Sequence, residues 1–313
     1  MALCSITCTA HALTIEFDYR YDLRGFFTDL ETGIARADRR AVLEHAAGFY
    51  ADFSDQLSAI EPAPGASWSV RFTHPSFAGP PVTLRDEAVP ANTIRIFVGG
   101  SNSAPGVLGF AGSGFDLQAS GSEAFVSAVF ARGQGNTRGE SATDYGPWGG
   151  FLWLNASYDW YAGLDPAGLS DGRPDLLTTA AHEIGHLLGI GDADAWRAQV
   201  IDGHFVGPAS VATYGATVPL DALNMHWADG VFSIVGESAQ ETLMDSVDPS
   251  GCARTADPAR LRGPARYRLD AGARAPAIDV VARAYCRRRS WPAAAPRPRA
   301  FVPCVNAEPR PAC

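Results

Sequence analysis

The sequence contains no lysine: all 25 basic residues are arginine, set against 34 Asp and Glu, for a net charge of −9 over 313 residues. Charged residues make up only 19% of the chain, while hydrophobic residues make up 46%. This composition excludes a chain that is disordered throughout, because it supplies enough apolar surface for a core. No apolar run reaches the roughly 18 residues that a transmembrane helix needs, so no membrane span is predicted.

Cysteine is missing from 13–250, so this central part needs neither disulfides nor thiolate metal ligands. Charge changes at the same boundary. Through Ser250 there are 12 Arg against 30 acidic residues, a net of −18, whereas the remainder has 13 against 4, a net of +9. Phosphate binding needs a basic surface, so the acidic part argues against nucleic acid as a partner. The six cysteines lie near the two ends: Cys4, Cys8, Cys252, Cys286, Cys304 and Cys313.

These boundaries divide the chain into three parts. Residues 1–12 end in Ala10-His11-Ala12, which fits a signal-peptidase site behind a truncated signal peptide and predicts export; the alternative is a frayed N-terminal strand. Residues 13–250 form the predicted folded domain. Residues 251–313, rich in Arg, Pro and Ala, have three interpretations: a poorly ordered basic tail, a small disulfide-bonded appendage, or translation in the wrong frame.

The hydrophobic pattern predicts a mixture of strands and helices without regular alternation, which favours the α+β class. A Gly/Ser-rich loop is expected over 99–121, and a long helix is expected after Pro174. The other expected elements are strands over 13–19, 67–73, 93–98 and 149–155, and helices over 37–60 and 122–132.

The segment whose residues are best suited to metal binding and catalysis is His182-Glu183-Ile184-Gly185-His186. On a helix, His182 and His186 stand four residues apart on one face and can bind one metal ion, while Glu183 beside them can hold a metal-bound water. Asp175 is a good N-cap for such a helix, and Gly189 can end it in the left-handed conformation. The alternative is a surface helix with two hydrogen-bonded histidines.

A catalytic zinc site usually has three protein ligands. A sharp turn at Gly189 lets a later residue return to the metal, and the candidates for the third ligand are Asp192 and His226. Neutral imidazole is the commoner zinc ligand, which favours His226. If Asp192 and Asp194 are not ligands, they can cap the following turn or bind a structural Ca²⁺. His204 could be a ligand, although no neighbouring feature supports it, and His45 and His74 are expected to be structural or solvated.

Residues 143–246 resemble the catalytic core of matrixin-like metzincins, a group of zinc metalloproteases, with the strongest similarity over 181–189. Matrixins have a third histidine where this chain has Asp192. Snapalysin-like enzymes use an aspartate there, whereas leishmanolysin-like enzymes insert a segment before a histidine in a His-Trp pair. This chain has His226-Trp227 followed by Leu243-Met244-Asp245, in the order of the second pattern. The resemblance therefore favours His226 as third ligand and Met244 as the Met-turn residue.

The resemblance implies a metzincin-like fold, with a mixed twisted sheet, a long active-site helix and a small irregular lower subdomain after Gly189. It implies a secreted, monomeric zinc endopeptidase of bacterial type, acting on proteins or peptides, with Glu183 as the general base toward a zinc-activated water. An extended substrate is expected to pair with the strand of the upper rim, whose substrate-binding residues would be Gly150, Phe151, Leu152 and Trp153.

A second hypothesis is a zinc-binding surface or interaction protein that no longer turns over substrate. Metzincins usually finish with a helix after the Met-turn. The segment 253–274 is a poor candidate for that helix because Pro258 and Pro264 interrupt it.

Overall fold

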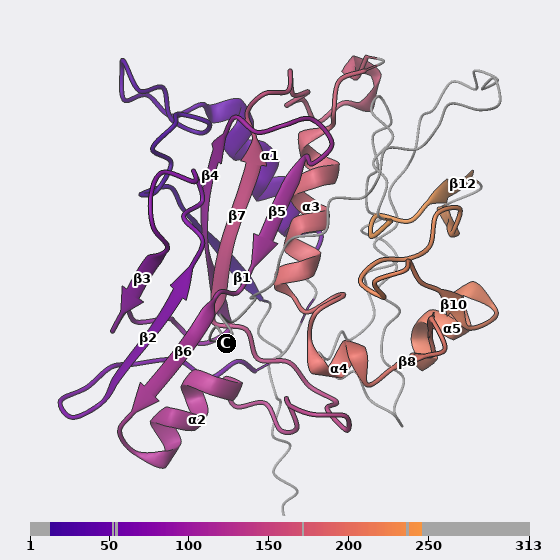
Figure 1. Ribbon diagram of the computed structural model, residues 1–313. Coiled ribbons are helices and arrows are strands. Elements are labelled where there is room, and N and C mark those ends of the chain that lie inside the picture. The colour runs from indigo at the N-terminus through magenta and orange to yellow at the C-terminus, as the bar shows by residue number, and fades with distance from the viewer. Residues whose placement is uncertain (1–12, 52, 54–55, 171, 236–237, 246–313) are drawn as a thin grey trace, which may run out of the picture.

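The computed structural model describes residues 13–245 except 52, 54–55, 171 and 236–237. The predictions for 1–12 and 251–313 lie outside these residues. Within them the chain mixes helices with a mixed sheet, which confirms the α+β class (Figure 1). No helix of the described part is long and apolar enough to cross a membrane.

The central sheet has four strands in the order β1, β4, β7, β5. The first three are parallel to one another, and β5 runs antiparallel to β7. Every residue of β7 is buried, as expected for a strand with neighbours on both edges and covered faces. The bounds are Thr14–Asp18 for β1, Thr93–Ser101 for β4, Gly149–Asn155 for β7 and Gly109–Gly112 for β5.

Smaller sheets flank the central one. The sheet β3-β2-β6 is antiparallel and consists of Val82–Arg85, Ser67–Phe72 and Phe115–Ser120. Two more lie late in the chain: β10-β9-β8, of Val218–Pro219, His204–Phe205 and Val200–Ile201, and the hairpin of β11, Phe232–Val235, with β12, Ser238–Glu241. The helices are α1 Ala37–Gly48, α2 Glu123–Ala131, α3 Leu176–Leu187, α4 Asp194–Arg197 and α5 Pro208–Tyr214, with a 3-10 turn over Pro166–Gly168.

Alternation along the central strands divides the core between the two faces of the sheet. Ile96 and Val98 face α1 and α3, whereas Phe97 between them faces the β3-β2-β6 sheet and α2. In β7, Leu152 and Phe151 divide in the same way. In Figure 1, α3 separates the central sheet from the later segment 190–245, which has an aromatic core of its own.

Two predictions about local structure were wrong. The helix expected over 37–60 ends at Gly48; its later apolar residues are buried without being helical, and Ile60 pairs with Val89 in a β-bridge. Glycine is a weak helix former, which favours an end there. The loop expected over 99–121 contains β5 and β6, because pairing with β7 and β2 overrides the weak strand preference of its glycine and serine residues.

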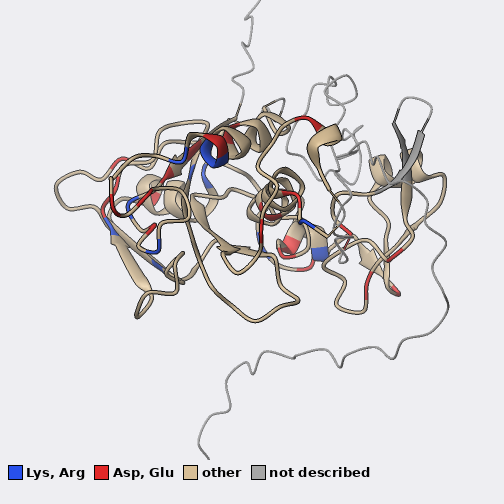
Figure 2. Cartoon of the chain, turned by 90° about the horizontal axis from the view of Figure 1, so that it is seen from above, with Lys and Arg blue, Asp and Glu red and all other residues tan. Residues whose placement is uncertain are grey.

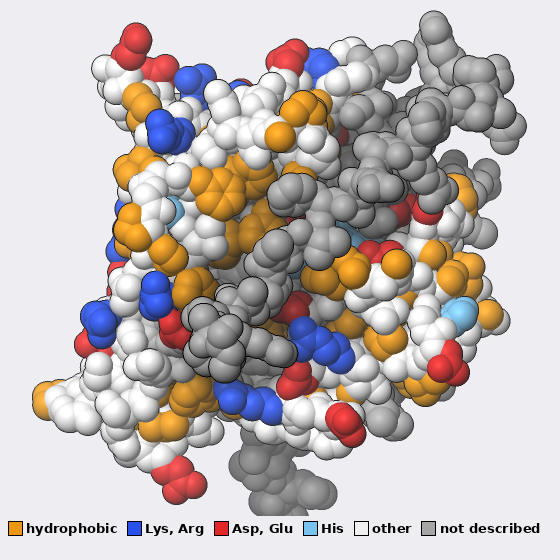
Figure 3. Space-filling model, viewed as in Figure 1, with side chains coloured by type: hydrophobic (Ala, Val, Ile, Leu, Met, Phe, Trp, Pro, Cys, Tyr) orange, Lys and Arg blue, Asp and Glu red, His pale blue; other side chains and the backbone are white. Residues whose placement is uncertain are grey.

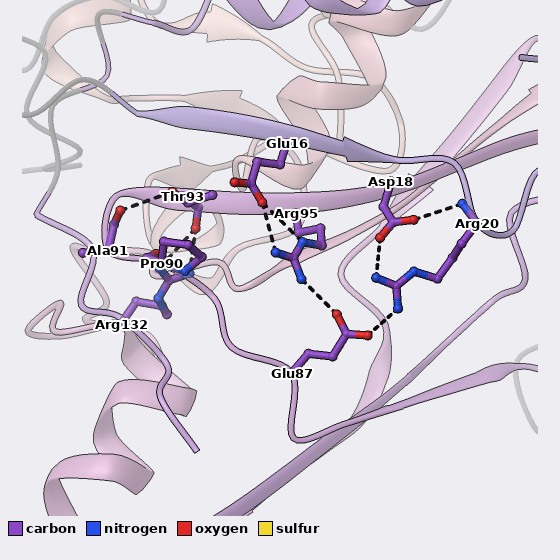
Figure 4. Close-up of polar contacts among 9 residues, drawn as sticks. All are labelled: Glu16, Asp18, Arg20, Glu87, Pro90, Ala91, Thr93, Arg95 and Arg132. Atoms are coloured by element: carbon purple, nitrogen blue, oxygen red, sulfur yellow. Dashed lines mark hydrogen bonds and ion pairs between the residues drawn. The ribbon is translucent and has the colours of Figure 1, made fainter. Parts of the chain in front are cut away.

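Arginine side chains join segments of this fold, and Figure 2 shows basic positions lying among the more numerous acidic ones of the described chain. Arg95 of β4 bonds Glu16 of β1 at 3.1 Å and Glu87 at 2.9 Å, and Glu87 also meets Arg20 (Figure 4). These pairs are partly exposed, so each contributes little to stability alone.

Arg132 is different because it is 0% exposed and its guanidinium contacts carbonyl groups. Burial lowers the pKa of Arg132 to about 10. Its N–H groups donate to four carbonyl oxygens, of which those of Pro90 and Thr93 are drawn in Figure 4, and these bonds tie the end of α2 to the start of β4. The acceptors are Ser58 at 2.5 Å, Pro147 at 2.9 Å, Pro90 at 3.0 Å and Thr93 at 3.1 Å.

Replacing Arg132 with methionine should therefore destabilise the domain by about 3 kcal/mol or more, since several buried carbonyls lose a charged donor. Urea unfolding of Arg132→Met measures this loss. Arg85→Met, at an exposed position, is the control and should change stability by less than about 0.5 kcal/mol. Equal stability of the two variants would contradict the role given to Arg132.

Candidate metal centre

Helix α3 begins and ends with complete capping interactions. Asp175 caps its start: the carboxylate accepts from the Thr178 N–H at 3.1 Å and from the Thr178 hydroxyl at 2.6 Å. At the end, Gly189 has φ +97°, and the N–H groups of Gly189 and Ile190 donate to the carbonyls of His186 and Gly185. This pair of bonds is a Schellman motif, which turns the chain sharply after His186.

Three histidines meet at the end of α3. The Nε2 atom of His186 lies 3.1 Å from that of His182 and 3.0 Å from that of His226. In the described part of the chain, they form the one group of three or more His, Cys, Asp or Glu side chains that could hold a metal ion. Residues 40 positions apart in the sequence thus converge on one point.

The hydrogen bonds of the three Nδ1 atoms determine whether the converging Nε2 atoms carry a proton or a free lone pair. Nδ1 of His182 bonds the carbonyl of Leu243 at 2.9 Å, and Nδ1 of His186 bonds that of Ile190 at 2.9 Å. Nδ1 of His226 bonds the carboxylate of Asp221 at 3.0 Å. Carbonyls and carboxylates can only accept, so each Nδ1 carries the proton and each neutral ring directs an Nε2 lone pair inward.

This donor set fits a metal ion. In a tetrahedral zinc site with Zn–N bonds of 2.0–2.1 Å, the nitrogens stand about 3.3–3.4 Å apart, close to the spacing of these histidines. Burial lowers the pKa of His186 to about 4, which keeps this ring neutral at pH 7 and able to bind a metal. Three imidazoles suit zinc, copper, iron and nickel.

Glu183 follows His182 on α3 and lines the same cleft as the three histidines. It is 6% exposed, and the N–H of Ala111 in β5 bonds its carboxylate. Burial raises the pKa of Glu183 to about 8, and the bond from Ala111 opposes that rise in part. A Cβ at Gly109 would lie 2.9 Å from Oε1 of Glu183, so the glycine leaves room for the carboxylate.

The turn at Met244 underlies the helix. A Cβ at Gly185 would lie 2.7 Å from Sδ of Met244, so the methionine packs directly against the backbone between the two helical histidines. The carbonyl of Met244 accepts from the N–H of Trp227 at 2.9 Å. With Leu243 bonded to His182, this turn contacts both the helix and the segment that carries the third histidine.

The other candidate ligands lie away from the three histidines. The carboxylate of Asp192 bonds Arg197 at 2.5 Å and is 65% exposed on its side chain, although it borders the same cleft. Asp194 bonds the N–H of Gly139 at 2.8 Å, and calcium binding by these residues stays a prediction. The remaining histidines of the described residues have other neighbours: His45 contacts Phe49, Nδ1 of His74 accepts from the Ser76 N–H, and His204 bonds the carbonyl of Asp202.

The histidines and Glu183 face a cleft of about 820 Å³. The strand that borders it is β5, because β7 pairs with β4 on one edge and β5 on the other. The strand-edge role expected for Gly150, Phe151, Leu152 and Trp153 therefore needs correction: the last three are paired on both edges, and of the four only Phe151 lines the cleft. Their hydrophobic sequence reflects an interior position in the sheet.

Sequence reasoning missed two features of this site. One is β5, which lies within a Gly-rich stretch. The other is Asp221, whose carboxylate meets His226 from five positions earlier. The only local signal was an acidic residue shortly before a candidate histidine ligand, a pattern typical of metal centres. Comparison of the chain with protein-family models, curated proteins and solved structures gives no match.

The geometry predicts one metal ion at this site, with His226 and not Asp192 as the third ligand. His226→Ala should lose most of the metal that the wild-type protein retains after dialysis, because two imidazoles alone bind weakly. Asp192→Ala should retain it. Elemental analysis by mass spectrometry measures both the amount and the identity of the metal, and loss in Asp192→Ala alone would reverse the assignment.

Proposed function

We propose that this protein is an exported zinc-dependent endopeptidase of metzincin-like fold. The observation that carries the proposal is the convergence of three Nε2 atoms next to the carboxylate of Glu183 in an open cleft. A helix with the pattern H-E-x-x-H gives this arrangement in zinc peptidases, where the glutamate is the general base. Among the metals that suit three imidazoles, zinc agrees best with that pattern.

Zn²⁺ held by His182, His186 and His226 would supply Lewis-acid chemistry, lowering the pKa of a water and polarising the scissile carbonyl. Glu183 accepts a proton from the attacking water and returns it to the amine that leaves. Burial raises the pKa of Glu183, which makes its ionised carboxylate a stronger proton acceptor, and the Ala111 N–H holds this carboxylate in place.

The edge of β5 is suited to binding an extended peptide. The carbonyl of Leu108 accepts from Asn155, so antiparallel alternation turns the main-chain groups of Gly109 and Ala111 away from β7. An incoming strand can pair with the main-chain groups of Gly109 and with the carbonyl of Ala111, whereas the Ala111 N–H already bonds Glu183. Backbone pairing of this kind is largely independent of the substrate's sequence.

Apolar side chains on the rim of the cleft can add a preference. Val107, Phe110 and Phe115 line the cleft and are 53%, 51% and 43% exposed. Figure 3 shows hydrophobic side chains gathered on the face over β5 and β7. We expect peptides with apolar side chains around the cleaved bond to be preferred over charged ones.

The alternative function is a zinc-binding interaction protein that does not turn over substrate. Proteolysis by the purified chain distinguishes the two. Casein should be cleaved, a chelator such as 1,10-phenanthroline should abolish cleavage, and added Zn²⁺ should restore it. Stoichiometric zinc without cleavage of casein, gelatin or a mixed peptide library would favour the alternative.

Glu183→Gln tests the role of the carboxylate separately from metal binding. Glutamine keeps the size and the acceptor for Ala111 but cannot take a proton, so kcat should fall by about 100-fold or more while the zinc content stays at the wild-type level. Glu140→Gln, at an exposed position, is the matched control and should leave kcat unchanged. Undiminished proteolysis by the Glu183 variant would exclude it as the base.

A further inference from the structure

The third histidine has a partner unlike those of the other two. His182 and His186 each bond a main-chain carbonyl through Nδ1, whereas His226 bonds a carboxylate, that of Asp221. The helix backbone also fixes the first two rings. His226 lies outside the helices and strands, so its ring needs another source of orientation.

Asp221 also closes the loop that carries His226. Its Oδ1 atom accepts from the N–H of Met225 at 2.9 Å and from that of His226 at 3.3 Å. Its own N–H donates to the carbonyl of His226 at 2.9 Å. The neighbouring residues continue the closure, since Leu220 pairs with Trp227 in an antiparallel bridge.

The two carboxylate oxygens therefore have separate tasks. Oδ1 holds the loop backbone, and Oδ2 accepts the ring proton of His226. The His226 ring and the backbone N–H groups of Met225 and His226 all donate to this side chain, so both of its oxygens are acceptors.

We propose that Asp221 is a positioning residue that fixes the orientation and the Nδ1–H tautomer of His226, so that its Nε2 lone pair faces the metal position. The proposal rests on the proposed metal-binding function of the three histidines. A carboxylate that bonds a ligating histidine in this way usually raises metal affinity by about 10- to 100-fold. The bond to Asp221 also fixes the ring of His226 in one orientation, although this residue lies in a loop and not in a helix.

Asparagine at position 221 separates the two tasks. It has one acceptor oxygen, which can continue to hold the N–H groups of Met225 and His226. Its NH₂ group then faces Nδ1 of His226 and can only donate, so the ring must accept at Nδ1 and carry its proton on Nε2. A ring in that tautomer cannot bind a metal through Nε2.

The experiment uses the full chain, freed of metal by a chelator, with Zn²⁺ alone as the probe. Competition with a fluorescent chelator should give a zinc Kd about 10- to 100-fold higher for Asp221→Asn than for wild type. Long-range ¹⁵N–¹H NMR of the metal-free proteins should show His226 as Nδ1–H in wild type and Nε2–H in the variant. Asp229→Asn, an exposed change three residues after His226, removes the same charge and should alter Kd by less than about twofold.

An unchanged Kd in Asp221→Asn, or an equal loss in Asp229→Asn, would overturn the proposal. If Asp221→Asn does not fold, the wild-type spectrum decides alone, because Nε2–H at His226 would overturn the proposal and Nδ1–H would support it. Absence of zinc binding by the wild-type chain would refute the proposed function instead, while the tautomer measurement would still test Asp221.

Discussion

The convergence of three imidazole nitrogens, with Nε2 of His186 at 3.1 and 3.0 Å from those of His182 and His226, is the constraint on which the rest of this site depends. Their lone pairs repel at that distance, and burial strengthens the repulsion because the surrounding dielectric is low. A cation between them turns this cost into attraction. Metal binding should therefore be coupled to the stability of the elements that hold the rings, as in other sites whose ligands lie far apart in the sequence.

The three acceptors that orient the rings come from three different segments. Ile190 follows the turn at Gly189, Leu243 lies next to Met244, and Asp221 closes the loop before Trp227. All three lie after α3, in the part of the chain whose core includes Trp196, Phe205 and Trp227. Ile190 and Trp227 belong to that core, whereas Leu243 packs in the main core with α3, so both cores contribute to the orientation of the three rings.

The sequence was most informative where the decisive interactions are local. Hydrophobic periodicity predicts the α+β class. The cap at Asp175 and the turn at Gly189 follow from residue types that strongly favour those positions. The spacing of His182 and His186 is local in the same sense, because four residues on a helix place two side chains on one face. His226 is 40 residues further on, and only its place in a resembling pattern singled it out.

The missed features depend on tertiary contacts. The four residues of β5 have weak strand propensity, and pairing with β7 makes them a strand. The same pairing removes the free edge that β7 was expected to offer. Asp221 meets His226 across a closed loop, where neither a helical nor a strand period applies. The apolar residues after Gly48 have the spacing of a helix, but buried residues outside a helix can show the same spacing over a short stretch.

The separation between the second and third histidines also explains which parts of the site can vary. Loop closure entropy rises only with the logarithm of length, so doubling the segment between His186 and His226 would cost about 0.6 kcal/mol. The helical spacing has no such freedom, since one residue more or less rotates a histidine away from the metal by about 100°. What the long segment must preserve is its ending: the ring of Trp227 packs in a tilted arrangement 5.1 Å from that of Trp196, and its backbone N–H donates to the carbonyl of Met244. A change in the length of this segment therefore costs little free energy of folding, while the packing of Trp227 determines whether His226 reaches the metal position.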